Sequence, residues 1–203
     1  MQKFATTQPI TADLDVPMGL VRLVATDRTD AIVDVRPTDP NSSADVKAAG
    51  QTTVEFTGGV LKVKSPEGPR FGRSGSVEVV VEVPSGSAVD GRGLATGFRT
   101  EGRFAATTIR TAQGDVALGT TDGPVVVRIE KGDVRVAEAV RGQLELTTLS
   151  GKVEVGVAEG VGAGLMVSTG YGNLTNHLKK IDGPAAVDIT ASTSHGDVIV
   201  RSN

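Results

Sequence analysis

Gly114-Asp115-Val116 is the first copy of a phrase that returns four more times: a glycine, a polar residue and an aliphatic residue. The other copies are Gly132-Asp133-Val134, Gly151-Lys152-Val153, Gly172-Asn173-Leu174 and Gly196-Asp197-Val198. Successive glycines are 18, 19, 21 and 24 residues apart. A period of this length is the mark of a repeat architecture. We therefore predict an all-β, right-handed β-solenoid built from stacked short strands.

Each repeat contains two short aliphatic runs, such as 116–118 and 125–127, separated by a turn. The turn Asp122-Gly123-Pro124 has a counterpart at Asp182-Gly183-Pro184. One repeat buries about four aliphatic side chains, which is too little to offset the entropy of ordering roughly 20 residues. The repeats must therefore stack, so that each one is stabilised by its neighbours.

Residues 1–87 lack the regularly spaced glycine phrase. We predict that they form an antiparallel strand region that caps the stack. Two alternating runs flank Gly58-Gly59, which predicts a hairpin over 52–64. A strict alternation of Val with other residues predicts a strand over 76–84. Residues 37–50 are typical of a loop, with a single helical turn at 44–49. Residues 88–203 contain the repeats of about 18–24 residues, and we expect one continuous structural domain.

Composition excludes several classes of protein. The 21 basic and 24 acidic residues give a net charge of −3 without a long block of one sign, so no nucleic acid or anionic lipid is expected as a partner. The absence of cysteine excludes disulfides, zinc–thiolate sites and thiol catalysis. We find neither a signal peptide nor an apolar run of membrane-spanning length. The expected location is therefore the cytoplasm, or the envelope if an anchor was removed.

We predict no catalytic residue, metal ligand or cofactor. Lys152 and Asn173 replace Asp at the second position of the phrase, which favours a turn over a calcium site. His177 and His195 lack a third ligand, and Ser194, His195 and Asp197 are too close in sequence to form a catalytic triad.

Paired carboxylates for sugar hydrolysis are not expected either. Glu78 and Glu82 lie on one strand face about 13 Å apart, which is too far for either hydrolytic geometry. Tyr171 is the only Tyr or Trp, and we expect it to pack at a rung edge rather than form a glycan platform.

The predicted structural residues are the turn glycines Gly114, Gly132, Gly151, Gly172 and Gly196. A possible partner-binding loop contains Arg70, Phe71 and Arg73, whose guanidinium groups suit a phosphate or a carboxylate. The alternative for this loop is a set of solvated arginines without a partner.

The sequence resembles the bacterial putative-adhesin domain of unknown function 4097. The resemblance covers nearly the whole chain and rests on Gly19-Leu20-Val21-Arg22-Leu23, Pro84-Ser85-Gly86, the Gly-Asp-Val phrases and Thr169-Gly170-Tyr171-Gly172. The opening Met1-Gln2-Lys3-Phe4 resembles the opening residues of the actinobacterial branch of this family. The resemblance implies a β-solenoid-like domain without an established reaction. Some relatives are linked to cell-envelope stress, and many carry a membrane helix before the repeats.

These observations favour a non-enzymatic binding or scaffolding module that uses flat strand faces rather than a pocket. The expected partner is another protein, with no membrane span and no small-molecule substrate. The alternative is a self-assembling, bactofilin-like oligomer or filament that pairs through an open C-terminal rung at Val198-Ile199-Val200. A polysaccharide-active β-helix enzyme is a third, less favoured hypothesis.

Overall fold

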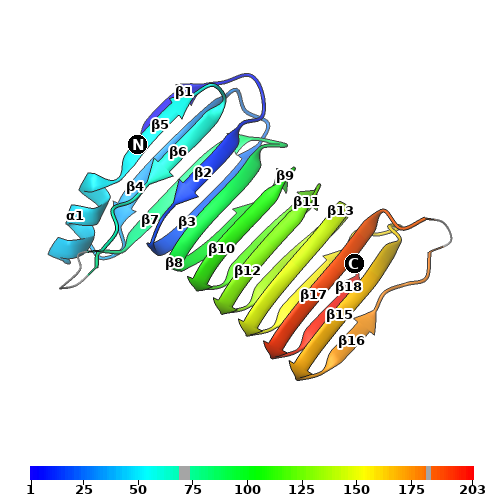
Figure 1. Ribbon diagram of the computed structural model, residues 1–203. Coiled ribbons are helices and arrows are strands. Elements are labelled where there is room, and N and C mark those ends of the chain that lie inside the picture. The colour runs from blue at the N-terminus through cyan, green and yellow to red at the C-terminus, as the bar shows by residue number, and fades with distance from the viewer. Residues whose placement is uncertain (69–73, 182–183) are drawn as a thin grey trace.

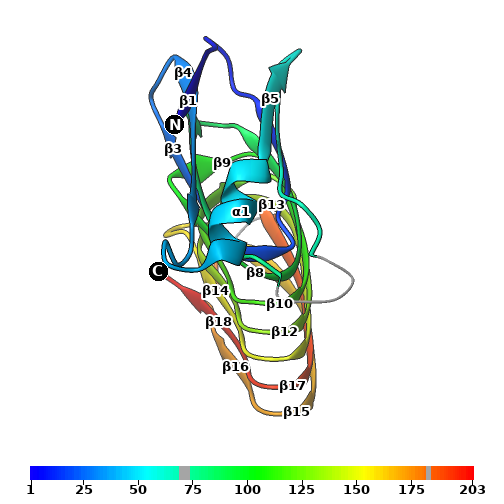
Figure 2. The same ribbon diagram turned by 90° about the vertical axis from the view of Figure 1, so that its left-hand side faces the viewer.

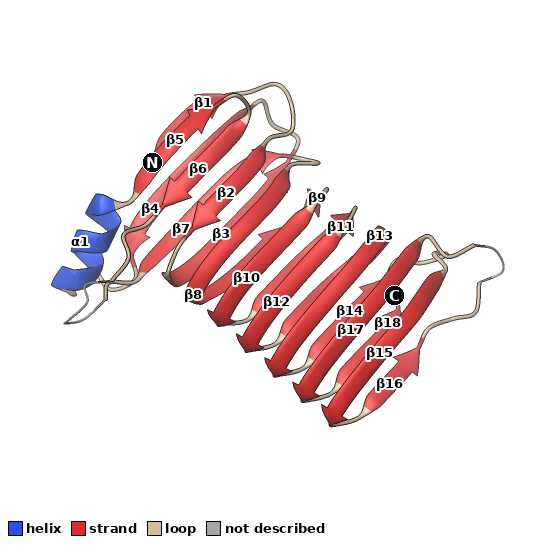
Figure 3. Cartoon of the chain, in the orientation of Figure 1, coloured by secondary structure: helices blue, strands red, loops and turns tan. Residues whose placement is uncertain are grey.

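The computed structural model describes residues 1–68, 74–181 and 184–203. Within these residues the chain forms one continuous 18-stranded sheet and one helix (Figure 3). The strands stack side by side in a long β-solenoid-like array whose two walls face each other (Figure 1). The predicted all-β solenoid-like class is thus confirmed. No described helix has the length and apolar character required to cross a membrane.

Wall A consists of parallel strands joined edge to edge. From the N-terminal end they are β6 (Val60–Lys64), β2 (Thr11–Asp15), the first half of β8 (Ala88–Glu101), β10 (Thr107–Gln113), β12 (Val125–Lys131), the second half of β13 (Val134–Ser150), β17 (Val187–His195) and β15 (Ala163–Tyr171). β5 (Thr53–Thr57) pairs antiparallel with β6 and forms the outer edge.

Wall B faces wall A across the core. Its order is β1 (Gln2–Ala5), β4 (Asp30–Pro37), β7 (Val77–Pro84), β3 (Met18–Thr26), the second half of β8, β11 (Val116–Asp122), the first half of β13, β14 (Val153–Val157), β18 (Val198–Ser202) and β16 (Leu174–His177). The short β9 (Arg103–Phe104) extends the β8 level beside β11.

The N-terminal region both continues and closes the stack. β2, β3, β6 and β7 pair in parallel with their neighbours, so the rungs begin before residue 88. The antiparallel pairs lie outside them, where β1, β4 and β5 form the outermost strands. Helix α1 (Ser43–Gln51) lies between the two walls at this end (Figure 2). The N-terminal end of the core is therefore covered by α1 and the antiparallel strands.

Helix α1 is longer than the single turn predicted at 44–49. Ser42 is its N-cap and accepts a hydrogen bond from the Asp45 amide. The Asp45 carboxylate also accepts from the amide of Ser76, which precedes β7. The first bond satisfies an amide at the helix start, and the second fastens the helix to the sheet. Ala48 is the buried apolar residue of the helix.

The core is an aliphatic ladder between the walls. Within each strand, alternate side chains point inward, and Val116, Leu118, Val125 and Val127 are almost completely buried. Nearly all buried core side chains in the described residues are Val, Leu, Ile or Ala. Since β-branched and aliphatic residues pack well on pleated strands, this composition explains why the rungs are regular.

The last two rungs are stacked in the reverse of their sequence order. β17 pairs with β13 on one side and with β15 on the other. Likewise, β18 lies between β14 and β16. The chain thus passes from β14 to the far end of the stack, forms β15 and β16, and then returns to fill the gap. The prediction of an open rung at Val198-Ile199-Val200 is therefore wrong, because β18 has partners on both sides.

A polar residue at a core-facing position explains this order. Asn176 of β16 is in register with Val200 of β18, which in turn is in register with the buried Val155 of β14. If β16 occupied the inner position, the Asn176 amide would be enclosed by aliphatic side chains at a cost of about 1–3 kcal/mol. At the end of the stack Asn176 stays exposed, and its Oδ1 accepts a hydrogen bond from the Leu178 amide.

Candidate functional site

A column of glycines lines the sharp corner between the walls. At Gly132 the backbone φ is +144°, and a Cβ atom would lie 2.3 Å from the carbonyl oxygen of Gly114 on the preceding rung. Neither the φ nor the contact is compatible with a side chain. The other predicted turn glycines share this geometry, with φ between +136° and +154° and a Cβ position 1.9–2.3 Å from a backbone oxygen: Gly114, Gly151, Gly172 and Gly196.

The aspartates that follow three of the corner glycines connect neighbouring rungs. Asp115 Oδ1 accepts a hydrogen bond from the Asp133 amide at 2.9 Å, and Asp133 Oδ1 accepts from the Lys152 amide at 2.7 Å. Asp197 Oδ1 accepts from the Asn173 amide at 2.8 Å. These carboxylates therefore bind backbone amides. In the described residues no group of three or more His, Cys, Asp or Glu side chains is arranged to hold a metal ion.

Lys152 interrupts this chain of links. A lysine side chain cannot accept a hydrogen bond, so the rung that follows in space, at Asp197, receives no such link from residue 152. The Lys152 ammonium instead donates to Glu154 at 3.1 Å. Arg201 of β18 also contacts Glu154, at 3.3 Å. The hydrogen bond from Lys152 lowers the pKa of Glu154 below its ordinary value. Glu154 thus connects β14 to the inserted strand β18.

A row of three arginines crosses the outer face of wall A. Arg92, Arg110 and Arg128 are in direct register on β8, β10 and β12. Neighbouring strands place them about 4.8 Å apart along the stack. The three side chains line a shallow surface hollow of about 380 Å³. The other residues of this hollow are Gly93, Thr111, Ala112, Ile129 and Glu130.

The central arginine of the row is available for a partner. Arg92 hydrogen-bonds Asp90 at 3.0 Å, and Arg128 hydrogen-bonds Glu145 at 2.7 Å. Arg110 is exposed and forms no ion pair with any residue of 1–68, 74–181 and 184–203. Because a guanidinium presents a fork of donors, Arg110 can bind a carboxylate or a phosphate from outside the chain.

The C-terminal end of the stack has a different chemistry. β15 and β16 each have a strand partner on one side only, β17 and β18 respectively. Met166, Tyr171 and Leu174 are 73%, 75% and 52% exposed there. The Tyr171 ring stacks on the His195 ring of the neighbouring strand, with centroids 5.1 Å apart. This end therefore combines unpaired backbone with exposed apolar side chains.

The remaining predicted polar residues do not gather into one site. His195 ends β17 on wall A, whereas His177 lies on β16 in wall B, opposite Arg201. Glu82 forms an ion pair with Arg28, while Glu78 lies farther along β7. The loop residues Arg70, Phe71 and Arg73 lie outside the described residues.

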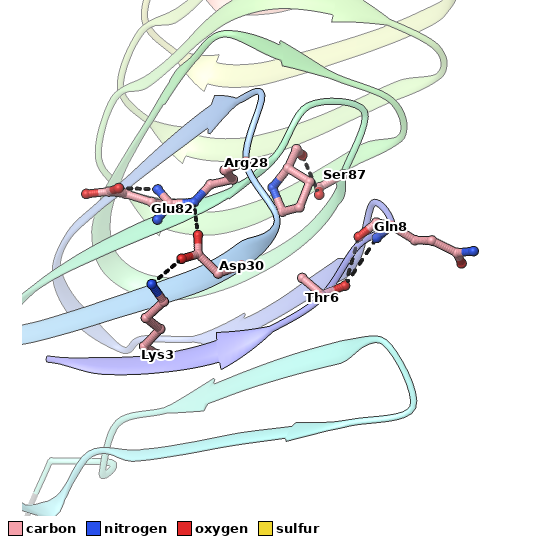
Figure 4. Close-up of polar contacts among 8 residues, drawn as sticks. Lys3, Thr6, Gln8, Arg28, Asp30, Glu82 and Ser87 are labelled. Carbon is pink, nitrogen blue, oxygen red and sulfur yellow. Dashed lines mark hydrogen bonds and ion pairs between the residues drawn. The ribbon is translucent and has the colours of Figure 1, made fainter.

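A partly exposed ionic network connects the outer strands of wall B (Figure 4). Arg28 contacts Glu82 on β7 and Asp30 on β4, while Lys3 on β1 lies 2.7 Å from the other oxygen of Asp30. Hydrogen bonds from Lys3 and Arg28 lower the pKa of Asp30. Nearby, the Ser87 hydroxyl donates to the Pro84 carbonyl and accepts from the Ile10 amide. These contacts connect β1, β4 and β7 and fasten the turn after β7 to the segment before β2.

Three features were missed from the sequence. Gly19 has a φ of +140° and stacks on Val77 in the same corner column, as its phrase Gly19-Leu20-Val21 could have indicated. The arginine row could have been found by aligning residues 92, 110 and 128, which are each 18 residues apart. The reversed order of the last two rungs has a weaker signal, namely the polar Asn176 at an aliphatic position.

Comparisons with known proteins place these features in a family. The model of the Toastrack family, DUF4097, matches residues 99–201. A putative cell adhesion protein from Clostridium sporogenes aligns over 100% of this chain and 98% of its own, with a TM-score of 0.56 and 8% identity. A putative adhesin from Parabacteroides merdae aligns over 98% of this chain and 94% of its own, with a TM-score of 0.46 and 12% identity. No curated protein matches the sequence significantly. At these identities the structural likeness concerns the fold alone.

Proposed function

Since the chain belongs to the Toastrack family DUF4097, we propose that it is a non-enzymatic binding module whose flat strand faces hold an acidic partner protein. The single observation that carries this proposal is Arg110, an exposed cation without an ionic partner among the described residues, set between two arginines in register. The names of the solved neighbours, a cell adhesion protein and an adhesin, agree with a binding role.

The geometry also indicates what kind of partner fits. Alternate side chains of one extended peptide are about 6.6–6.8 Å apart, whereas the arginines repeat at about 4.8 Å. Carboxylates on neighbouring strands of a sheet are spaced by about 4.8 Å, which equals the spacing of the arginines. A partner with acidic residues on neighbouring strands of a sheet therefore matches the row best, with one carboxylate facing the Arg110 guanidinium.

The binding proposal is tested with polyglutamate as a simple acidic probe. We expect Arg110→Ala to weaken polyglutamate binding several-fold in a fluorescence anisotropy titration, with affinity falling as salt is raised. Lys47→Ala is the matched control, because it removes one exposed positive charge from α1, away from the row. If both variants lose affinity equally, the probe senses only net charge and the arginine row is not the binding surface.

The place of action proposed for this module is the cell envelope, where an adhesion function would be exercised. The link to envelope stress and the actinobacterial branch both remain predictions. Fractionation of the native cell into cytosol, membrane and wall, followed by detection with an antibody, tests the location. Recovery in the cytosol alone would contradict it.

Self-assembly is a second candidate function, favoured by the unpaired outer edges of β15 and β16. The contact proposed here uses these edges instead of the predicted contact through Val198-Ile199-Val200, because β18 has strand partners on both sides. Sedimentation velocity over a range of concentrations tests it, because an associating chain shows an increase in mass. A mass of 20.8 kDa at every concentration would contradict it.

A further inference from the structure

The outermost strand of wall A is an unprotected sheet edge. β15 comprises nine residues and, among the residues that the structure describes, pairs with β17 alone, at the far end of the stack in Figure 1. Half of its backbone N–H and C=O groups are therefore directed away from the sheet, as at any edge. Natural edges of this length usually carry charges, proline or a bulge that prevents pairing with another chain.

β15 has none of these devices. Its sequence, Ala163 to Tyr171, contains no charged residue and no proline, and its register with β17 runs without a bulge. The outer strands at the other end differ, because β1 contains Lys3 and β5 contains Glu55, and helix α1 covers the core beside them. At the C-terminal end Leu178 packs against the core, and Lys179 and Lys180 line a hollow together with Ala163 and Leu165. The strand β15 itself nevertheless presents an uncharged edge, which is suited to form more sheet.

We infer that β15 pairs antiparallel with β15 of a second copy, so that two chains join by their C-terminal ends into a closed dimer. This inference rests on the self-association proposed above. A two-fold contact pairs one edge with an identical edge, so any charge on that edge would lie close to the same charge of the other copy, and the contact is favourable only for an edge without charge. β15 is such an edge.

The lengths of the two edge strands favour pairing of β15 with β15 over pairing of β15 with β16. A contact of β15 with β16 of the second copy would match nine residues with four, whereas β15 with β15 matches nine with nine. Centred on Val167, the antiparallel pairing sets Met166 of each copy opposite Ser168 of the other. It also covers Leu165 and Val167, which are only partly buried at the end of the core.

The two-fold arrangement limits assembly to two chains. Each copy uses its single long uncharged edge, and the opposite end is covered by α1 and the charged strands β1 and β5. A head-to-tail contact would instead leave a free edge at each step and produce filaments. The expected product is a dimer of twice the 20.8 kDa chain mass.

Charges placed on β15 test the contact directly. We expect Met166→Lys with Ser168→Lys to reduce the mass in sedimentation velocity from twice 20.8 kDa to 20.8 kDa, because lysines would face lysines across the two-fold axis. The variant with Met166→Glu and Ser168→Glu should also be monomeric. An equimolar mixture of the two variants should restore the dimer, which a fold defect would not allow.

The matched control lies one strand inward. Thr190 and Ser192 of β17 are in register with Met166 and Ser168, but β17 has partners on both sides. Lysines at 190 and 192 should therefore leave the dimer intact. A dimer that survives the lysines on β15 would overturn this contact while preserving self-association, and filaments would overturn the closed arrangement. Arg110→Ala, which tests the arginine row, should not change the mass.

Discussion

The rungs from β10 to β14 and those from β15 to β18 are built from the same phrase but follow different orders in space. Between Gly114 and Gly151 each rung stacks on the one before it in sequence. Beyond Gly151 the next neighbour is Gly196, and Gly172 lies outside it. The corner geometry is the same in both regions. The difference therefore teaches that the glycines define the shape of a rung, whereas the inward side chains decide its position.

The two regions also differ in what surrounds them. An interior rung has neighbours above and below, so its side chains and backbone are enclosed on both sides. The β15–β16 rung has one neighbour and tolerates a polar residue such as Asn176 at a core-facing position. Changes of the same type should consequently have larger effects in the interior than at the end.

The largest effect is expected at an interior corner. Gly132→Val should lower the free energy of unfolding by about 3 kcal/mol or more, because it combines a strained φ with a side-chain clash against the Gly114 carbonyl. Gly172→Val should cost less, since the end rung can shift away from its single neighbour. Urea denaturation of both variants measures the difference.

Gly160→Ala separates strain from clash. Gly160 has a φ of +73°, and a Cβ atom there would meet nothing within 4 Å. This variant should lose only about 1 kcal/mol. Equal losses in the Gly132 and Gly172 variants would show that the end rung is held as firmly as the interior.

Exchanging polar and apolar residues between the last two rungs should have the next largest effect. Val200→Asn places an amide inside the core, and we expect a loss of about 2 kcal/mol in urea denaturation. Asn176→Val at the end should change stability little. The double variant removes the reason for the reversed order. Hydrogen exchange should then protect β16 more than in the parent, and unchanged protection would contradict our explanation.

A smaller effect is expected at the ionic contact between β14 and β18. The lowered pKa of Glu154 means that its contribution to stability is complete above its ordinary pKa of 4.5 and is lost as pH falls through the lowered value in the folded state. Glu154→Gln should remove about 0.5–1 kcal/mol near neutral pH and nothing at strongly acidic pH. Parallel urea titrations at pH 7 and pH 3 test this. An identical loss at both pH values would exclude the ionic contribution.

The smallest effect is expected where the corner links are interrupted. Lys152→Asn supplies a side-chain oxygen for the neighbouring rung, but it also removes the contact of Lys152 with Glu154. Because each contribution is about 0.5–1 kcal/mol, the free energy of unfolding should change by less than about 0.5 kcal/mol. Asp133→Asn should change little, because its Oδ1 still accepts from the Lys152 amide. Thermal unfolding with and without calcium completes the test. A calcium-dependent shift in the parent that disappears in Asp133→Asn would contradict the turn role.

Much of the fold follows from local patterns. The glycine phrase, the hairpin turn at Gly58-Gly59 and the alternating valines of β7 each depend on residues close in sequence, and the structure places a corner, a hairpin and a strand there. The extent of α1 was underestimated, because its Ser42 cap and its contact with Ser76 involve residues from two separate segments.

The candidate site depends on contacts between distant segments. Arg110 is part of a row only because Arg92 and Arg128 lie beside it on two other strands. The free edge of β15 follows from the insertion of β17, which pairs with residues from 142 onward. The sequence pattern of one repeat predicts that it forms a rung. The order of the rungs depends on the relative free energies of alternative stacking orders, which the sequence of a single repeat does not show.

The insertion of β17 and β18 has a consequence for biosynthesis. Both neighbours of this rung, at β13–β14 and β15–β16, leave the ribosome before it does. The array therefore cannot be completed by simple addition at its growing end, because the β13–β14 rung lacks its neighbour until residues 187–202 are available. Nascent chains interrupted before that point display a long apolar surface, which is the signal that chaperones and proteases recognise. Closure of the core between β13–β14 and β15–β16 therefore depends on the rung that is synthesised last.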